Sequence, residues 1–327
     1  MPQPGERTDS AEIVAKIYSR ITGTGSYLPR RVLTNAELAT TTDTSDAWIR
    51  ARTGIVERHI AEAEETTTEM AVNAATAALK AAGVKANELD LIVVATITPD
   101  LIFPSTGALL QHRLGARTVG AMDLSAACSG FLYALALVDA MIGSGKCSTA
   151  LIVGSERMSH LLDWSERATC VLFGDGAGAA VLVSDSSPGV RSVHLHADGS
   201  TPDVLRTPSK QSPYLHMEGG TVFKFAVRGL VESGVECLKA NHMSPRDVTW
   251  LIPHQANLRI IEASARKLEI ARDRLIVTVD KHANTSAASI PLALDSGVRR
   301  GLIKAGDEVL LLSVGGGFTW ASCLMRW

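Results

Sequence analysis

No run of apolar residues in this sequence is long enough to cross a lipid bilayer. The longest apolar stretches, such as residues 91–98 and 309–314, are far shorter than the roughly 20 residues of a membrane-spanning helix, and they suit buried strands. The polar first 20 residues contain no apolar segment of the kind found in a secretory signal. We therefore expect a soluble protein without a membrane partner.

An excess of either charge is also missing. The 327 residues contain 32 Lys and Arg against 34 Asp and Glu, so no global charge attracts nucleic acid. Cysteine is sparse, because there are only five, an odd number, and none forms a C-x-x-C pair. This pattern predicts a reducing, cytoplasmic compartment and no structural zinc or other metal site.

The sequence does contain a regular alternation of strand and helix patterns, which is typical of an α/β fold. In the first half, the predicted helices are residues 70–82, 105–114 and 131–142, and the predicted strands are residues 91–97, 121–124 and 150–154. The second half repeats the order of helix, short linker and strand over residues 223–253. We therefore predict an internal duplication, with a polar tail at residues 1–16 and two halves at residues 17–185 and 186–327.

Two glycine-rich turns, at residues 174–178 and 315–317, need an explanation. A dinucleotide-binding fingerprint lies between a strand and a helix, whereas both of these turns precede strands. We therefore expect no nucleotide cofactor. The better interpretation of residues 315–317 is a backbone that passes close to a reacting centre, where a Cβ atom would not fit.

Cys128 is the first candidate for catalysis. It lies where a strand pattern changes through small residues into the apolar helix 131–142. A thiol at a helix N-terminus faces the positive end of the helix dipole, which favours the nucleophilic thiolate. The alternative is that Cys128 fills space in the core, as we expect for the other four cysteines.

Two polar motifs in the second half add candidates from other loops. His254 follows a predicted strand at its carboxyl end, where open α/β sheets place their sites. Asn284 precedes a run of small residues that opens a helix. Each has a simpler alternative, a core or surface histidine for His254 and a helix cap for Asn284. Together with Cys128 they form a nucleophile and two hydrogen-bond donors.

Six motifs in order give the chain, from about residue 15 to its end, a clear family resemblance. Residues 21–29 read ITGTGSYLP, and the others are TSDAWI at 44–49, RTGI at 52–55, FGDGAG at 173–178, PHQAN at 253–257 and NTSAAS at 284–289. The sequence resembles β-ketoacyl-acyl carrier protein synthase III, of the thiolase-like condensing enzymes. The resemblance implies a thiolase-like fold of two duplicated βαβαβαββ halves, each with a five-stranded sheet, in an α-β-α-β-α arrangement of layers.

The resemblance also implies a reaction. Cys128 would accept the acyl group of an acyl-CoA primer, with the carbonyl oxygen held by the N–H groups of Cys128 and Gly316. His254 and Asn284 would hold the thioester oxygen of malonyl-acyl carrier protein while carbon dioxide leaves. The resulting carbanion would then attack the acyl-cysteine, and no cofactor is needed.

The family pattern assigns residues to the carriers as well. Trp48 and Arg167 match a pair that holds the CoA adenine between them, Arg52 a phosphate contact and Asn257 a pantetheine contact. The alternative for Trp48 is a core aromatic. For the acidic carrier protein, Arg259, Arg266 and Lys267 follow His254 on one predicted helix, with Arg259 and Arg266 on one face of it, and Lys224 and Arg228 could extend this basic surface. The alternative there is ordinary solvated charge.

Three positions bear on the acyl group and on assembly. Phe103 matches an aromatic that enters the acyl pocket of the partner in a homodimer. Val314 stands where an aromatic residue often precedes the glycine turn, and Ala283 replaces a glycine before Asn284, so we expect a shifted backbone there. Two other functions remain open: a condensing or acyl-transfer enzyme that primes a polyketide or other secondary pathway, and a non-catalytic thioester-binding subunit.

Overall fold

The first half of the chain forms one mixed five-stranded sheet. The computed structural model describes residues 17–208 and 212–327, and the predicted tail at residues 1–16 lies outside the described residues. The strand order is β1-β7-β6-β4-β5, in which β4 is parallel to both of its neighbours and β7 is antiparallel to β6 and β1. The strands are β1 Tyr18–Tyr27, β4 Leu91–Ala95, β5 Gly120–Leu124, β6 Thr149–Arg157 and β7 Asp175–Asp185.

The second half forms a four-stranded sheet, so the expectation of five strands in each half is wrong. Its order is β11-β12-β13-β8, with β8 Val190–Ala197, β11 Trp250–Pro253, β12 Glu308–Gly315 and β13 Thr319–Arg326. Beside β11 the chain forms only a single bridge, between Leu251 and Leu275. The segment after Leu275 does not continue as a fifth strand, because the backbone N–H groups of Thr278 and Val279 donate to the side-chain oxygen of Gln255 and not to a neighbouring strand. That segment therefore leaves the sheet.

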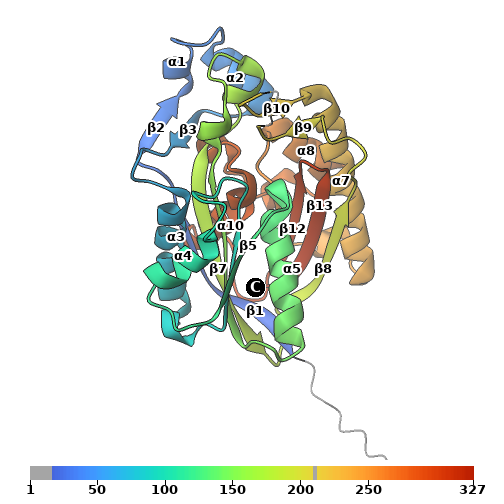
Figure 1. Cartoon of the computed structure of the whole chain (residues 1–327). Helices are drawn as coiled ribbons and strands as arrows, with labels where there is room; N and C mark the ends of the chain where they lie inside the picture. Colours follow the sequence, from blue (N-terminus) through green and yellow to red (C-terminus); the bar gives the residue numbers. More distant parts are fainter. Residues whose placement is uncertain (1–16, 209–211) are drawn as a thin grey trace, which may run out of the picture.

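Helices cover both faces of the two sheets and give the five layers expected from the sequence (Figure 1). Between the sheets lie α5 Gly130–Gly143 and α10 Ser289–Arg299. Outside the first sheet lie α3 Thr67–Ala82 and α4 Thr106–Arg113, and outside the second lie α7 Gly219–Ala240 and α8 Leu258–Lys267. The predicted thiolase-like layering is confirmed.

The central helix α5 shows how composition matches position. It carries no lysine, arginine or glutamate, and most of its large apolar side chains are fully buried, because packed structure surrounds it. Within the described part of the chain, no helix is long and apolar enough to span a membrane.

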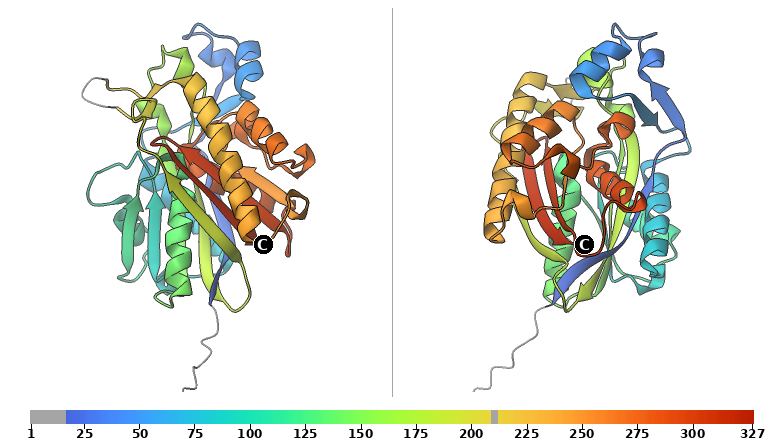
Figure 2. Two further views of the ribbon diagram at one scale, coloured as in Figure 1. Left: turned by 90° about the vertical axis from the view of Figure 1, so that its right-hand side faces the viewer. Right: turned by 180° about the vertical axis from the view of Figure 1, so that it is seen from behind.

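Two small sheets lie at one end of the large sheets (Figure 1 and Figure 2). One hairpin pairs β2 Arg31–Thr34 with β3 Glu57–Ile60, and a second small pair joins β9 Leu205–Arg206 to β10 His216–Met217. The short helices are α1 Asn35–Leu38, α2 Asp46–Thr53, α6 Arg167–Cys170 and α9 Val279–His282. Single 3₁₀ turns are η1 Ala86–Glu88, η2 Ala127–Ser129, η3 Met158–Leu161, η4 Pro245–Asp247, η5 Arg272–Arg274 and η6 Ser286–Ala288.

Candidate active site

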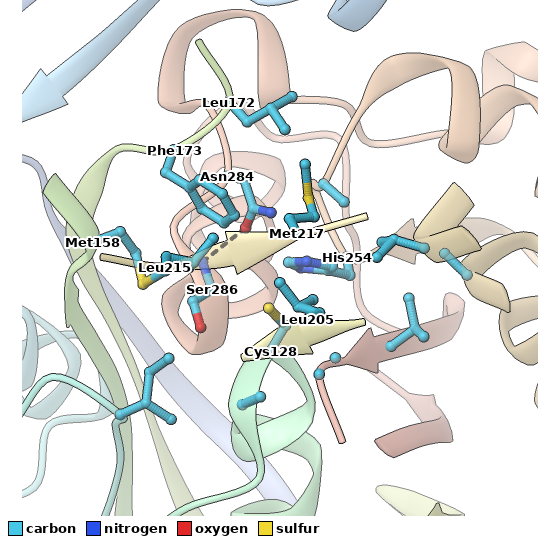
Figure 3. Close-up of a pocket in the computed structure, with 18 of the residues that line it drawn as sticks. Cys128, Met158, Leu172, Phe173, Leu205, Leu215, Met217, His254, Asn284 and Ser286 are labelled. Carbon is cyan, nitrogen blue, oxygen red and sulfur yellow. Dashed lines mark hydrogen bonds between the residues drawn. The ribbon is translucent and has the colours of Figure 1, made fainter. Parts of the chain in front are cut away.

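A cavity of about 840 Å³ lies where the two halves meet, and it is lined by residues of both. Cys128, His254 and Asn284 all line its inner end, although they come from η2 and from the segments after β11 and α9 (Figure 3). The wall around them is apolar and includes Met158, Leu172, Phe173, Leu205, Leu215 and Met217. The structure thus brings together the three residues that the sequence singled out.

Cys128 is held at the turn between β5 and α5, as predicted. The turn is fixed to the second half, because Ser129 Oγ donates to the carbonyl of Thr319 (3.1 Å) and Thr319 Oγ1 donates to the carbonyl of Ala126 (2.9 Å). Ala127 adopts φ +48°, a left-handed conformation that is uncommon for a residue with a side chain. The nucleophile therefore sits on a turn that tertiary contacts hold in place.

The protonation state of Cys128 corrects an expectation. Burial raises the pKa of the Cys128 thiol to about 12, while a hydrogen bond with the Ser286 side chain lowers it and the nearby Glu156 carboxylate raises it. At neutral pH the free protein therefore holds a thiol, not the thiolate that the helix N-terminus favours. The desolvation of a buried anion outweighs the helix dipole here.

The glycine turn after β12 passes close to the nucleophile, as the sequence predicted. A Cβ atom on Gly315 would lie 2.6 Å from the backbone nitrogen of Cys128, a distance that no side chain tolerates. Gly316 follows and lines the cavity beside Cys128. The residue whose missing side chain permits the approach is therefore Gly315, one position before the one assigned to the oxyanion site.

His254 is buried and oriented by a serine. Its Nδ1 lies 2.7 Å from Ser289 Oγ, and that oxygen also accepts a hydrogen bond from the backbone N–H of Gln255 (2.8 Å). Because Ser289 Oγ already accepts one bond, its hydroxyl proton is available for Nδ1, which leaves the hydrogen of the ring on Nε2. Burial lowers the pKa of His254 to about 3, so the ring is neutral and offers one N–H donor.

Asn284 is fixed by both its backbone and its side chain. Its N–H donates to Leu172 (2.9 Å) and its carbonyl accepts from Gly174 (3.1 Å), which ties it to the first half. Its side-chain Oδ1 accepts from the backbone N–H of Ser286 (2.9 Å). In Figure 3 the amide nitrogen points away from Ser286, on the side where His254 lies. The alternative of a helix cap does not describe this arrangement, since α10 begins at Ser289 after Ala288.

Backbone strain is concentrated at this inner end. Ala283 adopts φ +57° and ψ −160°, a region that is almost restricted to glycine, and Ser286 adopts φ +50°. With Ala127, three of the five described non-glycine residues with positive φ flank the catalytic candidates. The sequence predicted a shifted backbone at Ala283. In the structure, this alanine stands before Asn284 in a conformation suited to glycine.

The mouth of the cavity is polar, charged and exposed. Arg167 lies over the ring of Trp48, 4.7 Å from its centroid, and Arg52 lies 5.6 Å from it. Trp48 is half-buried and lines the cavity, so it is not simply a core residue. Asn257 also lines the cavity, but its side chain caps α8 by accepting from the N–H of Arg259 and donates to the carbonyl of Arg52.

The residues assigned to carrier-protein docking and to the acyl pocket differ in exposure and in whether they line the cavity. Lys224, Arg259, Arg266 and Lys267 are all exposed on α7 and α8, two helices that pack against each other. Val314 is buried and lines the cavity near Trp320. Phe103 is 84% exposed and does not line the cavity of its own chain.

The sequence reasoning missed Ser289 and Ser286, which form hydrogen bonds with His254 and Asn284, and Glu156, which accepts a hydrogen bond from the Ser286 hydroxyl. The two serines belong to the NTSAAS motif, so their hydroxyls offered a signal. Glu156 lies in an ordinary strand pattern and offered none.

Two family models match the chain. The model described as 3-oxoacyl-[acyl-carrier-protein] synthase III matches residues 122–199, and the model of the C-terminal part of that family matches residues 238–327. The chain is 54% identical over 321 residues to a β-ketoacyl-[acyl-carrier-protein] synthase III of Xylella fastidiosa, covering 95% of this chain and 99% of that protein. It is 53% identical over 321 residues to the protein of the same name from Alkalilimnicola ehrlichii, with the same shares covered.

Solved structures agree with these relatives. A 3-oxoacyl-[acyl-carrier-protein] synthase III of Aquifex aeolicus superposes with a TM-score of 0.92 at 47% identity, covering 94% of this chain and all of that one. A priming β-ketosynthase from a polyketide biosynthetic pathway superposes with a TM-score of 0.92 at 37% identity, covering 99% of this chain and 98% of that one.

Proposed function

This chain belongs to the β-ketoacyl-[acyl-carrier-protein] synthase III family and is an acyl-transferring condensing enzyme, and on that premise we propose that Cys128, His254 and Asn284 perform its condensation. The observation that carries the proposal is their convergence at the inner end of one cavity. The reaction initiates fatty acid synthesis by joining an acyl primer to a malonyl group.

In the first half-reaction, the Cys128 sulfur attacks the thioester carbonyl of an acyl-CoA. The carbon–sulfur bond to CoA breaks, and CoA departs as a thiol with the proton that Cys128 gives up. The backbone N–H groups of Cys128 and Gly316 stabilise the negative oxygen of the tetrahedral intermediate. Because Cys128 starts as a thiol, its proton must leave during this step, and reaction through one sulfur predicts ping-pong kinetics.

In the second half-reaction, malonyl-acyl carrier protein replaces CoA in the cavity. The Nε2–H of His254 and the side-chain N–H of Asn284 donate to its thioester oxygen, where negative charge develops as carbon dioxide leaves. The carbanion attacks the carbonyl of the acyl-cysteine, a carbon–carbon bond forms, and the bond to sulfur breaks. A neutral histidine suits this role, because the step needs a donor and no base.

The mouth would hold the carriers. The adenine of CoA would enter between Trp48 and Arg167, with Arg52 near its phosphates and Asn257 near the pantetheine arm. The exposed cations Lys224, Arg259, Arg266 and Lys267 would contact the acidic carrier protein. We expect this docking to weaken with salt, because exposed charges are screened.

A second copy of the chain is the partner that the first sheet favours. β5 is an edge strand, and Met122 on it is exposed together with Leu101, Ile102 and Phe103. An unpaired edge beside exposed apolar side chains is a surface that proteins cover. In such a homodimer, Phe103 would reach the acyl pocket of the other subunit. We propose that the enzyme works in the cytoplasm without a cofactor.

Priming of a polyketide pathway is the second candidate, and the similarity to a priming β-ketosynthase favours it. Choice of primer separates the two. Purified protein is mixed with malonyl-acyl carrier protein and either acetyl-CoA or longer acyl-CoAs, and β-ketoacyl product is measured. Fatty acid initiation predicts efficient use of short primers. Exclusive use of longer primers would favour the second candidate, and no product with any primer would refute both.

A further inference from the structure

One buried carboxylate next to the active site has no part in the reaction described above. Glu156 lies near the end of β6 and is fully buried. Within residues 17–208 and 212–327, no lysine, arginine or histidine forms an ion pair with it. A buried acidic group without a cation is costly unless several donors satisfy it.

Four donors meet at this carboxylate. Its Oε2 accepts from the Ile97 N–H (3.1 Å) and from the hydroxyls of Thr96 (3.2 Å) and Thr98 (2.5 Å), and its Oε1 accepts from the Ser286 hydroxyl (3.0 Å). The two threonine oxygens themselves accept backbone N–H groups, those of Thr98 and Arg157. Their hydroxyl protons are therefore free to point at Glu156, and the set of donors suits the ionised acid.

Ser286 connects Glu156 to the catalytic amide. Its hydroxyl donates to Glu156, while its backbone N–H donates to Asn284 Oδ1. Ser286 also has φ +50°, a conformation that needs tertiary contacts to persist. Because Oδ1 of Asn284 is occupied, the amide nitrogen is the group left for the cavity (Figure 3).

The same carboxylate acts on the nucleophile through its charge. Glu156 raises the pKa of the Cys128 thiol, after the larger effect of burial, because two neighbouring negative charges repel each other. Burial also raises the pKa of Glu156 itself to about 7, against its hydrogen bonds with Thr98 and Ile97. Glu156 is therefore only partly ionised near neutral pH, and its ionised form favours the thiol form of Cys128.

We propose that Glu156 is a positioning residue with two opposing effects: through Ser286 it orients Asn284 for decarboxylation, and its buried negative charge adds to the burial that disfavours the Cys128 thiolate. The inference rests on the function proposed for Cys128 and Asn284. It predicts that removing the charge makes the sulfur more reactive while the enzyme becomes slower. Loosening of the fold would also expose the buried thiol, so control variants must show that faster alkylation comes from the loss of the charge.

The test compares Glu156→Gln with Ser286→Ala, which breaks the same connection but keeps the charge. For each variant, condensation kinetics are measured, and the alkylation of Cys128 by iodoacetamide is followed at one pH by peptide mass spectrometry. Asp175→Asn is the matched control, because Asp175 is another buried carboxylate of this sheet, and its donors are a serine hydroxyl and backbone N–H groups.

For Glu156→Gln we expect kcat of condensation to fall about 10- to 100-fold, while kcat/KM for acyl-CoA, which reports acylation alone in a ping-pong reaction, does not fall. Alkylation of Cys128 should rise about tenfold, because loss of the neighbouring negative charge lowers the pKa of the thiol. Ser286→Ala should lower kcat similarly without the rise in alkylation, and Asp175→Asn should change neither quantity.

Unchanged condensation in Glu156→Gln, or slower condensation without faster alkylation, overturns the inference. If Glu156→Gln does not fold, Ser286→Ala and Glu156→Asp decide, and normal kcat in Ser286→Ala overturns it. A wild-type protein that forms no product refutes the proposed function instead, and that result is visible before any variant is made.

Discussion

The inner end and the mouth of the cavity differ in almost every physical property. Cys128, His254 and Asn284 are buried and uncharged in the free protein. Hydrogen bonds orient His254 and Asn284, and Cys128 and Asn284 each follow an alanine with positive φ. Trp48 and Arg167 at the mouth are more exposed, and their contacts are two arginines over the Trp48 ring and a hydrogen bond from Arg167 to the carbonyl of Asp43. The comparison teaches that the chemistry is preorganised, whereas carrier binding is adjustable. Changes inside should alter kcat, and changes at the mouth should alter KM.

The largest effect should come from Cys128→Ala. Because no acyl-enzyme can form, condensation should fall at least about 1,000-fold in an assay of β-ketoacyl product. Decarboxylation of malonyl-acyl carrier protein should persist, since His254 and Asn284 remain. Cys147→Ala is the control, as Cys147 is buried and does not line the cavity. Equal losses of condensation in both variants would show that Cys128 is not the nucleophile.

Asn284→Ala should lower the rate of decarboxylation about 100- to 1,000-fold, because one of two donors to the developing oxyanion is lost. Carbon dioxide release measures this step, and mass spectrometry measures acylation of Cys128, which should continue. His254→Ala should behave in the same way. A variant that fails to acylate but still decarboxylates would reverse the assigned roles.

The pH dependence separates the two half-reactions. The pKa of Cys128 is about 12, so the thiolate fraction rises about tenfold for each pH unit below it, and acylation should accelerate about tenfold from pH 7 to 8. His254, with a pKa of about 3, stays neutral throughout this range, so decarboxylation should be nearly constant. Single-turnover acylation measured against pH is the check. A plateau near pH 7 would show that the thiol is already ionised.

At the mouth, Trp48→Ala should raise KM for acyl-CoA by up to about tenfold through loss of stacking and cation–π contacts, and kcat should change little. Steady-state kinetics with varied acyl-CoA give both constants. Lower kcat with unchanged KM would mean that Trp48 supports the inner end instead.

The smallest expected effect concerns the strained backbone of Ala283. Ala283→Gly should stabilise the protein by about 1 kcal/mol, because relief of the backbone conformation outweighs the extra freedom of glycine in the unfolded chain. Denaturant unfolding measures this free energy. Lower stability would show that Ala283 is not strained.

The sequence was sufficient to predict the fold, which follows a repeated pattern, and the catalytic candidates, which lie in motifs. The layered fold follows from alternating strand and helix patterns, and Cys128, His254 and Asn284 from their places at element ends. Properties that arise from burial could not be predicted: the helix start at Cys128 suggested a thiolate, but the protein around it favours the thiol. Nor could the pattern reveal Glu156, because its partners Thr96 and Ser286 are distant in sequence.

The most direct test is the identity of the acylated residue. Purified protein is incubated with acetyl-CoA and with longer acyl-CoAs without malonyl-acyl carrier protein, and its intact mass and peptides are analysed. The account predicts one added acyl group per chain, on Cys128, and removal of that group when malonyl-acyl carrier protein is supplied. An acyl group on another residue, or none with any primer, would contradict it.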